Sequence, residues 1–354
     1  MRKTLLLFFV HLSIIVFAQA PSDYYKDAEG KSKGELKTAL HDIIRKHNYL
    51  EYNSSTSIWW YTYFKTTDWH PDGYFWDMYS TDRYASYDGR IQNREHCMPR
   101  SWWQLNGDYG DANGDLHNLQ PSNATANSAK SNYPPGEVDD IIFTNGVIKT
   151  GEGPTYSPSY RGALFEPADE YKGDFARIYM YMVTCYEDFR SRWTSLGVRT
   201  MLTKTAYPTF SSNAAELLLK WHRNDPVSTK ETDRNDAVYG IQGNRNPFVD
   251  NPELAEYIWG NKTNGKWGIQ GVFYEDFAIS VNKEGTRLTV HAAASDGDML
   301  TYQIFSIEGS LVDSQKINAY HNAIDISSLN NGMYILAVYL NNYRYTAKFY
   351  KNRF

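Results

Sequence analysis

The feature that most restricts the fold of this chain is a polar stretch at residues 93–133. It contains Glu95-His96, Asp115-Leu116-His117 and Asn127, with few apolar residues between them. Each buried polar group needs a hydrogen-bond partner, so a stretch of this composition is a poor candidate for the centre of an apolar core. We therefore expect these residues to form a site.

The start of this stretch is expected to be a short strand. Adjacent residues of a regular strand point to opposite faces of the sheet, so Glu95 and His96 can serve one centre only if the strand bends or ends there. Pro99 lies shortly after them and favours an end of the strand, because proline cannot donate a backbone hydrogen bond.

The rest of the stretch predicts a second strand and a helix. Residues 115–119 could form the second strand, and Pro121-Ser122-Asn123 offers a helix start. A helix over 122–131 would then carry Asn127 and Lys130. The order strand, loop, strand, helix would place the polar side chains around one centre.

These side chains suit the hydrolysis of a phosphodiester. That reaction needs a base for the attacking water, a cation on the phosphate oxygens and a proton for the leaving oxygen. His96 suits the first role because imidazole titrates near neutral pH. Glu95 and Asn127 offer oxygen ligands of the kind that Mg²⁺ and Ca²⁺ prefer. Water on such a cation would supply the proton, and His117 is expected to orient other groups.

Two other interpretations of the same residues stay open at this stage. Glu95 and His96 could be an ordinary solvated pair. Residues 111–115 resemble the first half of a calcium-binding loop, but Leu116 stands where that loop needs glycine and Ser122 where it needs glutamate.

Elsewhere the sequence predicts helices at three places. Apolar periodicity and capping residues indicate them over 34–50, 169–190 and 213–223. Asp169 is expected to cap the second of these helices. The aromatic segment 55–90 is expected to form short strands and turns under the site, and the amide-rich runs at 234–235 and 242–248 to be loops.

The two ends of the chain differ from its middle. Residues 1–20 have a basic start, an apolar run and Ala18-Gln19-Ala20, which predicts a secretory signal cleaved after Ala20. The run of about 15 apolar residues is shorter than the roughly 20 that a spanning helix needs. Residues 279–354 alternate in polarity between turns, which favours a small β-sandwich. Export would permit a Cys97–Cys185 disulfide, although two buried thiols are an equal alternative.

Charge does not by itself indicate a nucleic-acid partner. The net charge is −5, from 36 basic and 41 acidic residues. A protein of this balance that binds a phosphate backbone needs its Lys and Arg clustered on one face. The aromatic content of 16% leaves open a non-catalytic surface protein that binds glycans or DNA.

With these residues in hand, the chain resembles the bacterial endonuclease I family, whose active site is a ββα-metal (His-Me) finger. The similarity runs from Leu36 to about Gly260. The matching blocks are Arg94-Glu95-His96, Pro99-Arg100-Ser101, Asp115-Leu116-His117-Asn118-Leu119, Pro121, Asn127, Ser131-Asn132, Lys172 to Arg177, Trp221-His222, Asp225-Pro226-Val227, Arg234-Asn235 and Gln242 to Phe248.

The resemblance implies an α+β fold with a ββα-metal nuclease core and additional helices, in a catalytic domain over 21–278. It makes His96 the general base, supported by Asp115 and His117, and it makes Glu95 and Asn127 the metal ligands. Mg²⁺ is the expected ion, with Ca²⁺ or Mn²⁺ as alternatives. DNA, and also RNA, would be cut without sequence preference to leave 5′-phosphates. Asn113 stands where some relatives have an acid, so no side chain is assigned as the general acid.

Further expectations concern the partners. The residues selected for contact with the nucleic-acid backbone are Arg94, Arg100, Lys130, Arg177 and Arg245. Residues 279–354 resemble a sorting domain of the type IX secretion route, through Gln303-Ile304-Phe305, Gly332-Met333-Tyr334 and the final Lys348 to Phe354. That resemblance implies contact with the outer-membrane secretion machinery and a secreted or cell-surface protein. We expect a monomer. A metal phosphoesterase for small substrates is a further alternative.

Overall fold

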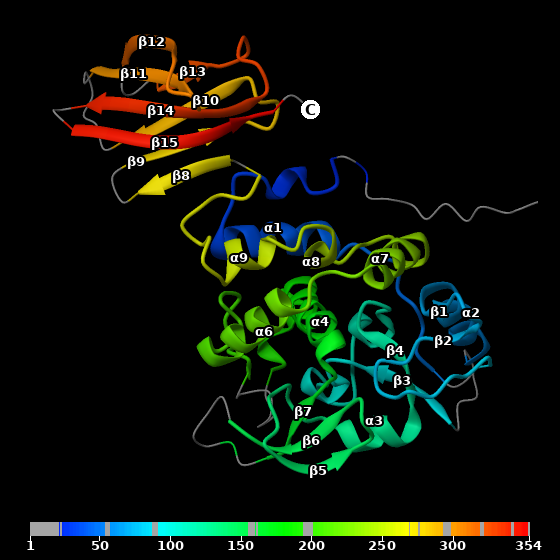
Figure 1. The fold of residues 1–354 in the computed structure, drawn as a ribbon. Helices are drawn as coiled ribbons and strands as arrows, with labels where there is room; N and C mark the ends of the chain where they lie inside the picture. Colours follow the sequence, from blue (N-terminus) through cyan, green and yellow to red (C-terminus); the bar gives the residue numbers. More distant parts are fainter. Residues whose placement is uncertain are drawn as a thin grey trace, which may run out of the picture.

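The fold is α+β, with small antiparallel sheets in a largely helical body followed by a sheet-rich C-terminal part (Figure 1). The computed structural model describes residues 21–352 apart from 22, 54–56, 87–90, 155–159, 161, 194–200, 269, 275–276, 293–298, 319–321 and 341–342. The signal sequence expected over 1–20 lies outside the described residues.

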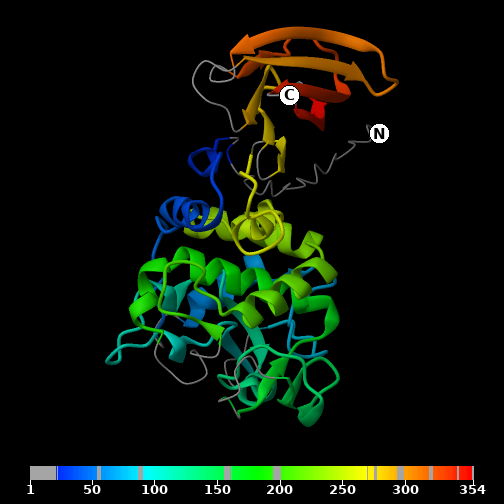
Figure 2. The same cartoon turned by 90° about the vertical axis from the view of Figure 1, so that its left-hand side faces the viewer.

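The helical body contains the elements expected around the polar stretch. Its helices are α1 (Lys33–Ile44), α2 (Ser57–Thr67), α3 (Ala124–Lys130), α4 (Lys172–Cys185), α6 (Ser212–Asn224), α7 (Thr229–Gln242), α8 (Pro247–Asp250) and α9 (Leu254–Ile258). Its antiparallel sheets pair β1 (Trp69–His70) with β2 (Tyr74–Phe75), β3 (Gln92–His96) with β4 (Leu119–Asn123), and β5 (Asp140–Thr144), β6 (Lys149–Glu152) and β7 (Leu164–Glu166) in that order. In both Figure 1 and Figure 2 the β5–β7 sheet lies on one side of the helices.

Helix α4 is the centre of the main apolar core. Every residue from Gly173 to Cys185 is buried, and the helix packs against α1 and α6. A helix that is buried on all sides needs apolar groups all round, which its run of Phe, Ile, Tyr, Met and Val supplies. The helix predicted over 169–190 is therefore confirmed in its middle. Asp169 does not cap it, because a short 3₁₀ turn (Asp169–Tyr171) precedes α4 and Asp169 pairs with Lys172 in solvent.

Helix α2 shows that the prediction of short strands throughout 55–90 was wrong. Trp60 and Phe64 are four residues apart and fully buried, and they pack with Val238 of α7 in a second core cluster. Residues at this spacing share one face of a helix. This shared burial outweighs the preference of aromatic residues for strands. Among the described residues of this segment, only β1 and β2 are strands.

The prediction of a loop at 234–235 was wrong, because these residues lie in helix α7, whose inward face is polar. The run 242–248, also predicted as a loop, includes the end of α7 and the start of α8. A capping box of Ser228 and Glu231 begins α7, and Gly243 ends it in the left-handed conformation. The side chain of Arg234 is buried, where it donates to Asp68 (2.7 Å) and to the carbonyls of Leu116 (2.8 Å) and Leu119 (2.7 Å). Arg234 therefore fastens α7 to the entry of β4.

The β3–β4–α3 unit follows the predicted order, with one shift. Strand β4 begins at Leu119 rather than ending there, and residues 115–118 form the turn before it. His96 pairs with Leu119 at the end of β3. The Asn123 side chain then caps α3 by accepting from the backbone N–H groups of Thr125 (2.8 Å) and Ala126 (2.9 Å). No residue separates β4 from α3, so the helix is held close to the strands.

The C-terminal part is the predicted small β-sandwich. The chain runs through β8 (Gln270–Tyr274), β9 (Phe277–Val281), β10 (Arg287–Ala292), β11 (Met299–Ser306), β12 (Leu311–Asn318), β13 (Ala323–Asp325), β14 (Gly332–Leu340) and β15 (Tyr343–Lys351). These form two four-stranded sheets, ordered β13-β10-β9-β8 and β12-β11-β14-β15. Side chains from both sheets, among them Ile279 and Leu336, share one apolar core.

Two smaller observations complete the fold. Cys97 and Cys185 are buried free thiols, so the disulfide alternative is not formed. The Cys97 sulfur lies 3.0 Å from the Tyr79 hydroxyl, and the Cys185 thiol donates to the Ile44 carbonyl at 3.6 Å. Within the described ranges, the helices are all too short or too polar to cross a membrane.

The Arg234–Asp68 pair gives a first prediction. Arg234→Met leaves Asp68 buried without its cation and should lower the free energy of unfolding by about 3–5 kcal/mol. Lys262→Met removes the half-exposed Lys262–Glu253 pair and should cost less than about 1 kcal/mol. Denaturant titrations followed by tryptophan fluorescence report on the helical body, because the last Trp of the chain is Trp267. Equal losses of unfolding free energy in the two variants would contradict a stabilising role for the buried Arg234–Asp68 pair.

Candidate active site

One open groove collects most of the residues expected at the site. It has a volume of about 770 Å³ and lies beside β3 and α3. Arg94, Glu95, His96, Arg100 and Asn127 all line it. The structure thus brings together the proposed base, both proposed metal ligands and two of the five basic residues selected for backbone contact.

His96 is held in one tautomer. Its Nε2 atom lies 2.9 Å from the carbonyl oxygen of Asn113. A carbonyl can only accept a hydrogen bond, so Nε2 carries the proton and Nδ1 keeps its lone pair. The ring packs between Tyr52 and Trp103, with centroids 5.1 and 5.9 Å away. Burial, reinforced by nearby cationic side chains, lowers the pKa of His96 to about 3. The imidazole is therefore neutral in the free groove, with the Nδ1 lone pair unprotonated.

Glu95 is held by Lys130, whose predicted role needs correction. Lys130 is fully buried, and its Nζ atom donates to Glu95 Oε1 at 2.6 Å and to the His96 carbonyl at 3.3 Å. It does not line the groove and is not placed to bind a phosphate. Burial raises the pKa of Glu95, while the charge of Lys130 opposes that rise. Lys130 thus holds Glu95 and the His96 backbone from inside the fold, and both of these residues line the groove.

Asn127 reaches the same groove from α3. It lies one turn before Lys130, so one helix presents a groove residue and the lysine that holds Glu95. Glu95 and Asn127 together offer oxygen donors from two elements, which fits a hard divalent cation.

Gln92 is a groove residue that the sequence did not reveal. It begins β3, and both its side-chain nitrogen and oxygen are buried without a hydrogen-bond partner among the described residues. An unpartnered buried amide costs free energy. Its position next to Glu95 and Asn127 is therefore a second sign that this part of the groove is built for a polar or charged ligand.

Arg94 and Arg100 keep their charge available. The Arg94 guanidinium lies 3.9 Å from the ring centroid of Tyr52, and that of Arg100 lies 4.8 Å from the ring centroid of Tyr109. Neither has a carboxylate partner in the part of the chain that the structure describes. An aromatic face does not neutralise a guanidinium, so both can still bind an anion.

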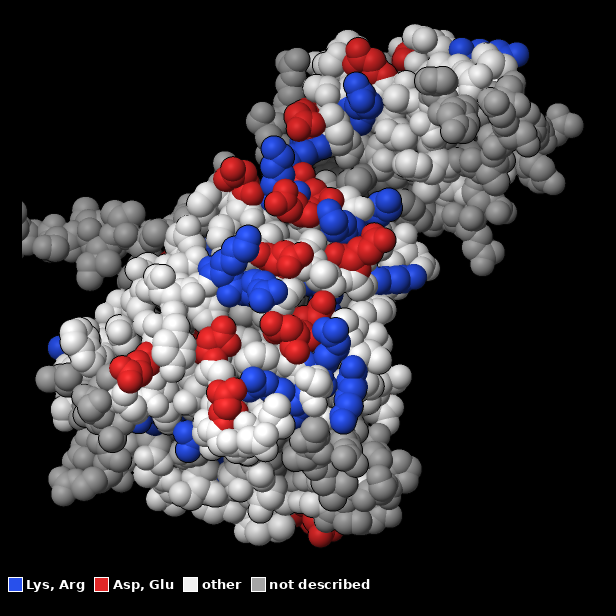
Figure 3. Space-filling model, turned by 180° about the vertical axis from the view of Figure 1, so that it is seen from behind, with Lys and Arg blue, Asp and Glu red and all other residues white. Residues whose placement is uncertain are grey.

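Arg177 and Arg245 lie outside the groove, which corrects their predicted contact with the nucleic-acid backbone. Arg177 is fully buried and donates to both carboxylate oxygens of Glu231, at 2.5 and 2.8 Å. Arg245 is buried and paired with Asp250 and Asp236. A buried guanidinium needs such partners. Basic and acidic side chains are also interspersed on the surface seen in Figure 3.

Asp115 and His117 do not line the groove either. Asp115 Oδ2 accepts from the hydroxyls of Tyr181 and Tyr186, each at 2.7 Å. His117 packs on Tyr181, with its Nε2 atom 3.2 Å from the carbonyl of Asn244. Any support that these two residues give to His96 is therefore indirect, because they hold the turn before β4 and not a group in the groove. The calcium-loop alternative is wrong, since residues 111–114 form a 3₁₀ turn and Asp115 is enclosed.

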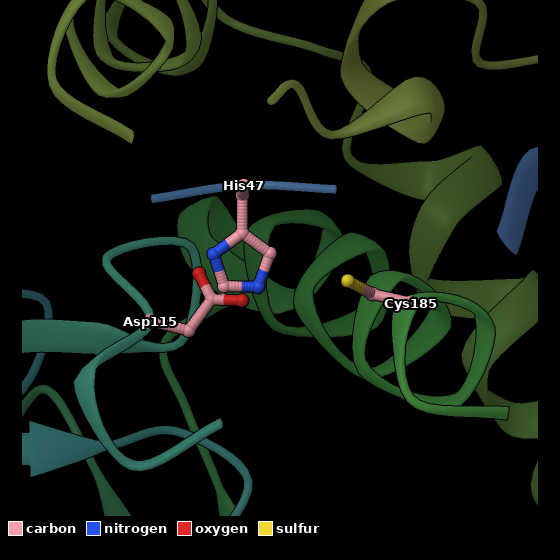
Figure 4. A group of neighbouring side chains, drawn as sticks. All are labelled: His47, Asp115 and Cys185. Carbon is pink, nitrogen blue, oxygen red and sulfur yellow. The ribbon is translucent and has the colours of Figure 1, made fainter. Parts of the chain in front are cut away.

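A second cluster of metal-ligand type contains His47, Asp115 and Cys185 (Figure 4). Its ligand atoms lie within 4.8 Å of one another. They are already engaged in hydrogen bonds, since His47 Nε2 lies 3.1 Å from the Tyr186 hydroxyl and the Cys185 thiol donates to Ile44. Burial raises the pKa of Cys185, whereas a metal needs the thiolate. The cluster is therefore a hydrogen-bond network in this structure.

A strand pair, a following helix and a neutral histidine beside oxygen-bearing side chains are the arrangement expected of a nuclease of the ββα type. Comparison with known proteins agrees. Residues 32–253 match the family model described as Endonuclease I, and the chain belongs to this family. Residues 283–352 match the Secretion system C-terminal sorting domain, which marks a secreted or cell-surface protein.

Several curated proteins are similar to this chain. It is 35% identical over 246 residues to an extracellular ribonuclease of Bacillus amyloliquefaciens, covering 67% of this chain and 78% of the relative. The extracellular ribonuclease of Bacillus subtilis (strain 168) is 33% identical with the same coverage. Endonuclease-1 of Buchnera aphidicola subsp. Baizongia pistaciae is 28% identical over 171 residues, covering 44% of this chain and 60% of the relative. The chain is therefore a nuclease rather than a non-catalytic binding protein.

The enclosed position of His117 gives a second prediction. Burial lowers its pKa to about 4, against 6.5 for an ordinary histidine. Between pH 6.5 and pH 4, His117 is therefore protonated in the unfolded chain but neutral in the folded protein. Stability supported by neutral His117 is complete above pH 6.5 and is lost as the pH falls towards 4, by up to about 3 kcal/mol.

His117→Gln should remove the pH-dependent part of the stability that His117 contributes. Its unfolding free energy should fall less steeply than that of the wild type between pH 6.5 and 4, as measured by denaturant titrations at several pH values. Parallel curves for the two proteins would show that His117 does not titrate in this way.

Proposed function

We propose that this chain is a secreted endonuclease that hydrolyses phosphodiester bonds of DNA, and also of RNA, with His96 as the general base. Glu95 and Asn127 would hold one Mg²⁺-type ion, and the products would carry 5′-phosphates. The observation that carries the proposal is the shared groove, in which a neutral His96 with a free Nδ1 lone pair lies beside Glu95 and Asn127.

The chain's own residues can perform the base step. Nδ1 of His96 would take a proton from a water molecule while the water oxygen bonds to phosphorus. The bond from phosphorus to the 3′ oxygen would break, and that oxygen would take its proton from a second water molecule in the groove. The pKa of His96 in the free groove is low, but a bound phosphate favours the charged imidazolium and raises that pKa. The Asn113 carbonyl keeps the ring oriented throughout.

The cation would neutralise charge on the phosphate as it develops. Two oxygen donors from the protein leave most positions to water and substrate, as Mg²⁺ prefers, and Mn²⁺ or Ca²⁺ could use the same ligands. Lys130 would keep Glu95 Oε1 occupied, so that Oε2 is the oxygen directed to the ion.

The groove also bears on the choice of substrate. Arg94 and Arg100 suit phosphate oxygens, which every sequence shares, so cleavage would not depend on sequence. The relatives are named as an extracellular ribonuclease and as endonucleases, so both nucleic acids are proposed substrates. We further propose a monomer with a catalytic domain over 21–278 and a sorting domain over 279–354 that contacts the secretion machinery.

Plasmid cleavage tests the base and the ligands. With Mg²⁺ the wild type should nick supercoiled plasmid, and chelator should stop it. His96→Ala should lower the rate about a hundredfold or more, because a general base typically contributes that much. Glu95→Gln and Asn127→Ala should need more Mg²⁺ to reach half-maximal rate.

His70→Ala is the matched control, since His70 lies in the β1–β2 hairpin and does not line the groove. It should cleave at the wild-type rate. Full cleavage by His96→Ala would contradict the proposed base, and unchanged cleavage in excess chelator would contradict the metal.

The two available arginines give a separate prediction. In a His96→Ala background, Arg100→Ala should weaken DNA binding and make the plot of log affinity against log salt shallower by about 0.9 for a lost phosphate contact. Arg223→Ala removes an exposed arginine paired with Glu256 and should leave that slope unchanged. Fluorescence anisotropy with labelled duplex measures both. Equal slopes in all three proteins would exclude Arg100 from phosphate binding.

A further inference from the structure

The wall of the groove includes a segment from outside the ββα unit. Residues 48–53 run between α1 and α2 and are tied down at two points. The Asn48 N–H donates to the Gln242 carbonyl at 2.7 Å. The Leu50 carbonyl lies so close to Gly114 that a Cβ atom on Gly114 would come within 1.8 Å of it. Gly114 belongs to the same 3₁₀ turn as Asn113, the partner of His96.

These two contacts hold the segment so that Tyr52 lines the groove beside Arg94, Arg100 and His96. The Arg94 guanidinium lies over its ring at 3.9 Å, and the Arg100 guanidinium lies 5.5 Å from its centroid. The His96 ring is 5.1 Å away. Arg94 also donates to the carbonyl of the next residue, Asn53, at 3.3 Å. The Tyr52 ring therefore lies close to the proposed base and to both available arginines.

An aromatic contact suits this position better than an ion pair would. A long arginine side chain in solvent samples many rotamers, and ordering it on the substrate costs entropy. A carboxylate would order the guanidinium but would also neutralise it. The face of a tyrosine ring attracts the cation and leaves its N–H donors directed outward.

We propose that Tyr52 is a positioning residue that holds the guanidiniums of Arg94 and Arg100 in the groove, ready for phosphate oxygens of a polynucleotide backbone. The inference rests on the proposed nuclease function and deepens it. Tyr52 acts through the two arginines and not through its hydroxyl. The ligand is the polyanionic backbone of a nucleic acid. Loss of the Tyr52 ring should therefore weaken substrate binding more than it slows the chemical step.

Steady-state cleavage of a labelled oligonucleotide in Mg²⁺ tests this role. Tyr52→Phe keeps the ring and should match the wild type. Tyr52→Leu keeps an apolar side chain without the ring, and should raise KM about tenfold while kcat changes less than about threefold. Its KM should also depend less steeply on salt than that of the wild type. A purely structural role would instead lower kcat or melting temperature and leave the salt dependence unchanged.

A mutant cycle identifies the residues through which Tyr52 acts. In an Arg94→Ala, Arg100→Ala background, Tyr52→Leu should add less than about twofold to KM, since the groups it positions are gone. The inference about Tyr52 is overturned by a full tenfold rise in KM in that background, or by a Tyr52→Phe variant whose KM is as high as that of Tyr52→Leu. In either case, cleavage by the wild type would still support the proposed nuclease function. A wild type that cleaves neither DNA nor RNA with any divalent cation overturns both.

Discussion

The buried pair of Lys130 and Glu95 is the interaction on which the rest of the site depends. Lys130 reaches from the last turn of α3 to Glu95 and to the His96 carbonyl, so one ammonium group fixes a helix against the end of a strand. The same helix carries Asn127, which is why both proposed metal ligands line one groove. A buried carboxylate without its cation typically costs about 3–5 kcal/mol. Alignment of the ligands and stability of the ββα unit therefore rest on the same contact.

The distribution of charge is compatible with the proposed phosphate site in an acidic chain. Some of its basic groups lie inside the fold, where Lys130, Arg177 and Arg234 each satisfy a buried carboxylate. These pairs hold elements together and contribute little to the external field. Arg94 and Arg100 differ because they lie against aromatic rings and form no ion pair among the described residues. A count of Lys and Arg in the sequence does not distinguish basic residues in buried ion pairs from those that remain available for an anion, because that depends on the contacts made in the fold.

The sequence predicted the parts of the fold that depend on local order. The β3–β4–α3 unit was recognisable because Pro99, the Asn123 cap and the polar side chains lie within one short stretch. Helix α7 was not recognisable, since Glu231, Arg234 and Asn235 face inward as polar groups and leave no apolar stripe. Arg177 and Arg245 were misplaced for a similar reason, because sequence spacing does not indicate the acids with which they pair in the folded chain. Tyr52 joins the groove only through long-range contacts at Gly114 and Gln242, which no local pattern indicates.

Anomalous diffraction from crystals of the His96→Ala variant grown with Mn²⁺ would test the central claim most directly. Manganese replaces magnesium at oxygen sites and gives a signal that locates the ion without reference to activity. The account predicts an anomalous peak coordinated by Glu95 and Asn127 on the groove side of Lys130. A peak at His47, Asp115 and Cys185 instead, or no ion bound to Glu95 at saturating Mn²⁺, would contradict it.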